Sequence, residues 1–185
     1  MTIETLLREH RETLIKQWTE AIFSTYPLDT TGFLRNSRDP FTNPVGSKTL
    51  RAVEVMYDAI SGCDMPDGEP ESALADLVRI RAIQNFTPEK ALGVIFSVKP
   101  LLRKAVLPAA LEHGLLNDFL EVESRVDTLS LLAFRHYAQD REQLHMLKVD
   151  EYKRRYAQLI RRAEMIVDEP AGEPDQSTTE SLAAR

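Results

Sequence analysis

The sequence RIRAIQNF, residues 79–86, sets two arginines and a glutamine among apolar residues. If this segment is a helix, Arg81 borders the buried face and Arg79 points away from it. A guanidinium at the edge of a core needs a carboxylate, a carbonyl group or a bound anion as its partner. The segment therefore has two interpretations, a structural clamp and a ligand site.

In the clamp interpretation, Arg81 pairs with Asp127 or Glu123, which lie one turn apart on a later predicted helix. In the ligand interpretation, Arg81 holds a small anion together with Gln84 and Asn43. We expect the clamp and keep the ligand site as the alternative. Neither requires bond-making chemistry, and we predict no catalytic residue, because no activated nucleophile or tuned acid–base pair can be identified.

Motifs for nucleotide binding, metalloproteases and serine hydrolases (GxGxxG, the Walker loop, HExxH and GxSxG) are missing from the sequence. The four histidines are too scattered to predict a metal site. A globin would need only one proximal histidine on a late helix, and His136 occupies such a position. The sequence has no further sign of a haem pocket, so we expect no cofactor. A ligand- or haem-binding globin-like protein stays the alternative function.

The elements that must position these residues are all predicted helices, because no alternating strand pattern occurs. They cover residues 3–26, a segment from Pro44 through Ile60, 71–85, a segment from Pro88 that Pro100 and Pro108 interrupt, and 117–168. Residues 27–43 are predicted to form a long loop. We expect an all-α domain, globin-like or a helical bundle, with a long protruding C-terminal helix. It would be a single domain over residues 1–169, and the polar tail 170–185 would be disordered.

The last predicted helix has two apolar stripes. At 1.5 Å per residue it would be a rod of roughly 75 Å, longer than the core of such a domain. The first stripe comprises Leu115, Phe119, Val122, Val126, Leu129 and Ala133. The second is offset by roughly 200° and comprises Val149, Tyr152, Tyr156, Leu159, Ala163 and Ile166. One stripe would face the domain, and we expect the other to form a homodimer as a short coiled coil. A fold-back of the N-terminal segments, or a bend in the rod, is the alternative.

The net charge of the chain limits the classes of molecule that can be its partners. The chain carries a net charge of −6, which argues against nucleic acid and anionic membranes as general partners. Residues 148–162 are nevertheless basic, with six cations and two acids, and an acidic protein partner would suit them. No run of about 18 apolar residues predicts a membrane span. The N-terminus does not resemble a signal peptide, and one cysteine, Cys63, fits a reducing compartment. We expect a cytoplasmic protein.

The sequence resembles the RsbRD N-terminal domain family in three segments: FTNPVG (41–46), RIRAIQNFTPEKALGVIF (79–96) and ESRVDTLSLLAFRHYAQDREQLHMLKVDEYKRRY (123–156). These domains are named after co-antagonist proteins of the bacterial stressosome, in which a sensory N-terminal region precedes a STAS domain. The resemblance implies a helical bacterial signalling module, and related sensor domains are non-haem, globin-like dimers. Only the polar tail follows the long helix here, so we expect a free-standing module that acts through a separate signalling protein.

Overall fold

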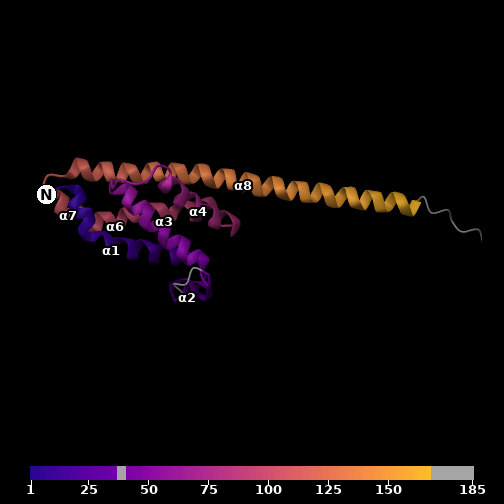
Figure 1. Ribbon diagram of the computed structural model, residues 1–185, viewed down its shortest axis with the longest axis horizontal. Helices are drawn as coiled ribbons and strands as arrows, with labels where there is room; N and C mark the ends of the chain where they lie inside the picture. The colour runs from indigo at the N-terminus through magenta and orange to yellow at the C-terminus, as the bar shows by residue number, and fades with distance from the viewer. Residues whose placement is uncertain (37–40, 168–185) are drawn as a thin grey trace, which may run out of the picture. The chain divides into compact units, whose positions relative to one another are not determined.

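The computed structural model describes residues 1–36 and 41–167, and every regular element in these two ranges is a helix (Figure 1). The helices are α1 (Ile3–Phe23), α2 (Leu28–Asn36), α3 (Pro44–Ile60), α4 (Glu69–Ile83), α5 (Pro88–Phe96), α6 (Val98–Ala105), α7 (Leu107–Glu112) and α8 (Leu116–Val167). The predicted all-α class and long C-terminal helix are confirmed.

Contacts divide the chain into two units, residues 1–144 and 145–185, which are described separately. The prediction of a single domain over residues 1–169 stays a prediction. The predicted disordered tail, 170–185, lies outside the described residues.

Local signals set the starts of α1 and α3. Thr2 caps α1 by accepting a hydrogen bond from the Thr5 amide, and Asn43 caps α3 by accepting one from Gly46. The Asn43 amide also donates to the Leu34 carbonyl at 3.0 Å. A Cβ at position 46 would overlap the Asn43 side chain, so this cap requires glycine. The stretch FTNPVG is thus the start of α3, with Pro44 in its first turn.

The predicted loop over residues 27–43 is wrong in part, because α2 occupies Leu28–Asn36. The Thr31 hydroxyl lies 2.9 Å from the Pro27 carbonyl just before α2, and 3.3 Å from the Phe23 carbonyl at the end of α1, so it links the first turn of α2 to that helix end. Leu34 packs with Phe23 and Tyr26 in a small cluster separate from the main core. Tertiary packing of this kind stabilises a short helix that its own sequence does not predict.

The main core of residues 1–144 lies among α1, α3, α4 and the α5–α7 segment, with α1 packing on α3 and α6 and α3 packing on α4 (Figure 1). Two buried aromatic side chains form hydrogen bonds across this core. The buried Trp18 indole donates to the Val94 carbonyl at 2.7 Å, and the Tyr57 hydroxyl donates to the Leu7 carbonyl at 2.8 Å. Burial raises the pKa of Tyr57 to about 12. Pro100 and Pro108 lie in the first turns of α6 and α7. The prediction that these two prolines interrupt the helical segment from Pro88 is confirmed.

The first part of α8 buries the predicted first stripe. Phe119, Val122, Val126, Leu129 and Ala133 all belong to the core, and Tyr137 adds one further turn to the buried face. Leu115 packs against the same core while staying partly exposed. The part of α8 that lies within residues 1–144 therefore packs on the core through one continuous apolar face.

Residues 145–167 are helical throughout. From residue 150 to residue 163 every side chain is exposed. No helix within residues 1–36 and 41–167 has the length and apolar character needed to cross a membrane.

Candidate functional site

Arg81, in the last turn of α4, is the most unusual polar residue of the core because its side chain is 0% exposed. Its Nη2 donates to the Thr25 hydroxyl at 2.9 Å and to the Lys90 carbonyl at 2.8 Å. Thr25 follows the end of α1, and Lys90 lies in the first turn of α5. The guanidinium therefore joins the ends of three helices.

Two aromatic rings enclose the guanidinium. The Arg81 Cζ atom lies 4.2 Å from the centroid of Phe86 and 5.4 Å from that of Tyr26. The rings meet edge to face, with centroids 5.2 Å apart and planes at 70°. Contacts of this kind stabilise a cation that has been removed from water.

The end of α4, within the segment RIRAIQNF, positions the Phe86 ring. Asn85 adopts a positive φ of 59°, and the Phe86 amide donates back to the Arg81 carbonyl at 3.1 Å. This is the Schellman pattern, with asparagine in the left-handed position. The Tyr137 hydroxyl on α8 donates to the Phe86 carbonyl at 2.6 Å. The helix end, the ring and the guanidinium are thus fixed together.

The buried charge is incompletely paired. Arg81 Nε and Nη1 and the Tyr26 hydroxyl are buried and have no hydrogen-bond partner among the described residues. No carboxylate from those residues forms an ion pair with Arg81 either. Burial lowers the pKa of Arg81, and the Tyr26 phenol acts in the opposite direction. Burial also raises the pKa of Tyr26. The Tyr26 phenol is the polar group beside this guanidinium that acts against the effect of burial, while Nε and Nη1 are left without a hydrogen-bond acceptor among the described residues.

The predicted clamp of Arg81 with Asp127 or Glu123 is wrong. Asp127 pairs with Lys99 at 2.6 Å, and both Nε and Nη2 of Arg103 donate to Glu123, at 2.7 and 3.0 Å. These two carboxylates bind α8 to α6 instead. Arg81 does not pair with either carboxylate, because its guanidinium is directed to the ends of α1 and α5.

The other predicted ligand residues do not gather around Arg81. Gln84 is exposed at the end of α4. Asn43 is buried, but its side-chain amide both accepts from Gly46 and donates to Leu34, so its visible role is to cap α3. Arg79 is exposed as predicted and lies 3.4 Å from Asp140. Only Arg81 of the predicted set has unpaired donors in the core.

The predicted second stripe lies on an exposed part of α8. Tyr152, Tyr156 and Leu159 are 60%, 65% and 58% exposed, Ala163 is exposed and Val149 is partly buried. The side chain of Ile166 is outside the described part of the chain. Large apolar side chains at this spacing on a helix surface are typical of a seam that a second helix covers. We call residues 149, 152, 156, 159 and 163 the α8 seam.

The histidines and the cysteine lie apart. His136 Nε2 contacts Glu71 Oε1 at 3.1 Å at the edge between α4 and α8. Cys63 is exposed. Within residues 1–36 and 41–167, no three histidine, cysteine, aspartate or glutamate side chains are grouped so as to hold a metal ion.

A hollow that was not predicted from the sequence lies beside α1 and α3. It has a volume of about 460 Å³ and is lined by Glu4, Arg8, Arg11, Tyr57, Asp58, Ser61, Gly62, Cys63 and Asp64. The Arg11 guanidinium donates twice to Asp58, at 2.8 and 2.7 Å, on its wall. Arg11 and Asp58 belong to different helices, so no local motif could have indicated the pair.

The comparisons with known proteins agree with the sequence resemblance. The family model described as RsbT co-antagonist protein rsbRD N-terminal domain matches residues 12–151. No curated protein and no solved structure gives a significant match. The match includes the whole of the Arg81 site and the first residue of the α8 seam. Because it covers more than half of the chain, the protein belongs to the RsbT co-antagonist protein rsbRD N-terminal domain family.

Proposed function

We propose that this protein is a bacterial, cytoplasmic regulatory sensor that works by protein–protein contact at the α8 seam and not by catalysis. Its family is one of stressosome-type signalling sensor domains, which supports the general class. The observation that carries the proposal is the seam itself. Tyr152, Tyr156 and Leu159 are all more than half exposed at coiled-coil spacing.

In this proposal two chains associate through their seams, and the sensed signal alters the register or splay of the paired helices. The seam side chains lie at alternating three- and four-residue steps, which is the spacing that two helices need for knobs-into-holes packing. Each chain would also contact a separate signalling protein, in keeping with a regulatory family that has no assigned reaction of its own.

The test replaces Tyr156 and Leu159 together by glutamate and measures mass by light scattering across a range of protein concentrations. We expect the wild-type protein to associate and the double variant to be monomeric, because the change places charges in an apolar contact. Arg154→Glu with Arg161→Glu is the control for position, since these residues lie on the opposite side of the helix, and it makes the larger change in net charge. Wild-type association that survives Tyr156→Glu with Leu159→Glu would overturn the proposal.

For the sensed signal, we propose a small anion that binds Arg81. The support is the pair of buried donors, Nε and Nη1, that no described residue satisfies. Inorganic phosphate and nitrate, each at constant ionic strength against chloride, are suitable probes in a thermal unfolding assay. Binding at 100 times the dissociation constant would stabilise the fold by about 2.7 kcal/mol. Arg81→Met should abolish that response, whereas Arg79→Met should retain it; equal responses in both variants would refute an anion site at Arg81.

A further inference from the structure

The charges that flank the α8 seam all have one sign. With Val149, Tyr156 and Ala163 at the a positions of a heptad and Tyr152 and Leu159 at the d positions, the preceding g positions are Lys148, Arg155 and Arg162. The e positions with described side chains are Lys153 and Ile160. No acidic residue occupies any of these five flanking positions.

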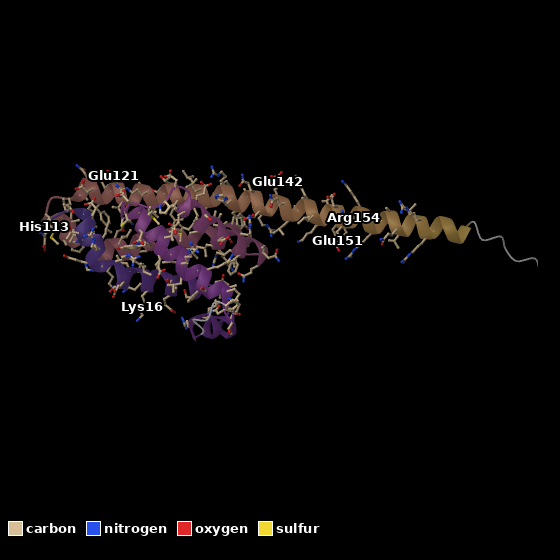
Figure 2. All side chains as sticks on the ribbon, in the orientation of Figure 1. Lys16, His113, Glu121, Glu142, Glu151 and Arg154 are labelled. Atoms are coloured by element: carbon tan, nitrogen blue, oxygen red, sulfur yellow. The ribbon has the colours of Figure 1, made fainter. Side chains whose placement is uncertain are left out.

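The two nearby carboxylates lie elsewhere on the helix. Asp150 and Glu151 occupy the b and c positions. Glu151 pairs with Arg155, and Asp150 lies 3.9 Å from Lys153. Lys148 and Arg162 form no ion pair with any described residue. Figure 2 labels Glu151 and Arg154 on this part of α8, where side chains extend from the helix surface.

A second copy of the chain cannot neutralise these cations along the seam. In a parallel pair each g residue faces the e residue five positions later on the partner, so Lys148 would face the partner's Lys153 and Arg155 would face the partner's Ile160. In an antiparallel pair g faces g and e faces e, which again places cation against cation. Like charges at flanking positions disfavour a pairing, and opposite charges favour it.

We propose that the preferred occupant of the α8 seam is a helix of another protein that carries apolar residues at its a and d positions and glutamate or aspartate at its e and g positions. Its carboxylates would lie beside Lys148, Arg155, Arg162 and Lys153, while its apolar stripe covers Tyr152, Tyr156 and Leu159. This inference rests on the proposed function, since it uses the same seam. Beyond the proposed function, the inference states that two copies of the chain bind each other more weakly than one copy binds the acidic helix. The charge of the flanking residues would then select the partner.

The test uses the full chain and two synthetic helical peptides of three heptads. Both peptides have isoleucine and leucine at a and d; one has glutamate and the other lysine at e and g. Binding is followed by fluorescence anisotropy of the labelled peptide. We expect the glutamate peptide to bind and the lysine peptide not to bind. Raising the salt concentration should weaken binding of the glutamate peptide, because salt screens the attraction between its carboxylates and the seam cations. The same salt should strengthen self-association, because it screens the repulsion between the cations of two chains.

Two double variants separate seam recognition from general charge attraction. Lys148→Glu with Arg162→Glu changes two g positions, and Arg154→Glu with Arg161→Glu changes two f positions with the same change in net charge. From the usual strength of exposed ion pairs, we expect the first variant to bind the glutamate peptide roughly tenfold more weakly and to gain binding of the lysine peptide. We expect the second to keep the wild-type preference. Equal effects of the two variants would overturn the inference.

The outcomes also separate this inference from the proposed function. A tight dimer that does not respond to salt and excludes the glutamate peptide would refute the acidic partner and leave the seam contact standing. If Tyr156→Glu with Leu159→Glu changes neither self-association nor peptide binding, both fail. Self-association that weakens with salt would overturn the acidic partner, because it would point to an acidic surface of a second copy as the occupant of the seam. Binding to duplex DNA or to vesicles of anionic lipid in preference to the peptide would also overturn the acidic partner.

Discussion

Replacing Arg81 by lysine should damage the fold more than replacing it by methionine, although lysine keeps the charge. Arg81 Nη2 donates to both the Thr25 hydroxyl and the Lys90 carbonyl, and its flat guanidinium lies 4.2 Å from the Phe86 centroid. A lysine ammonium retains the cost of burying a cation. It cannot reproduce the planar contact with the ring or span the same two acceptors.

The size of the effect follows from those contacts. A hydrogen bond from a charged donor contributes about 1.5–3 kcal/mol, and a desolvated cation over a ring contributes up to about 2 kcal/mol. Losing one such bond and the ring contact should lower the free energy of unfolding by about 2–5 kcal/mol in Arg81→Lys. Methionine loses the same contacts but also removes the buried charge and the two unpaired donors, so its net cost should be smaller.

The assay is urea unfolding followed by the fluorescence of Trp18, the single tryptophan, which is 0% exposed and lies in the core of residues 1–144. Arg79→Lys is the control within the same motif. Its side chain is exposed, so a change within about 0.5 kcal/mol is expected. If Arg81→Lys is as stable as Arg81→Met, the guanidinium does not depend on the contacts described and the reasoning is refuted.

Three further predictions use the same unfolding assay. Asn85→Val should destabilise by about 1–2 kcal/mol, since a β-branched residue resists a positive φ, whereas Asn85→Gly should be near neutral; equal effects would contradict the left-handed helix end. Gly46→Ala should cost about 1–3 kcal/mol by displacing the Asn43 cap, and a stable Gly46→Ala protein would exclude that close approach. Tyr137→Phe should cost about 1–2 kcal/mol by removing the hydrogen bond to the Phe86 carbonyl; no change would mean that water replaces the bond.

Local patterns predicted the elements well. Thr2 and Asn43 mark helix starts by capping hydrogen bonds to amides three residues later, and Pro88 marks one by its place in the first turn of α5. Apolar spacing alone located the buried face of α8. Helix α2 was not predicted. Its stability depends on Leu34 packing against residues that lie outside it, and that contact has no local pattern.

The environment of Arg81 could be predicted only in part. Its spacing on α4 indicated that it borders the core and that Arg79 is exposed, and both hold. Its partners could not be predicted, because Thr25 and Lys90 come from other helix ends and one of the acceptors is a backbone carbonyl. Asp127 and Glu123 were plausible partners by charge, but Lys99 and Arg103 are the cations that the packing of α6 on α8 brings to them.

Site-specific cross-linking tests the seam contact most directly. In a Cys63→Ser background the chain has no other cysteine, so Leu159→Cys places a single thiol at a d position and Arg161→Cys places one on the opposite side of the helix. Under mild oxidation in high salt, which screens the flanking cations, the account predicts a disulfide-linked dimer for Leu159→Cys and little for Arg161→Cys. Equal cross-linking at both positions, or none at Leu159→Cys, would contradict it.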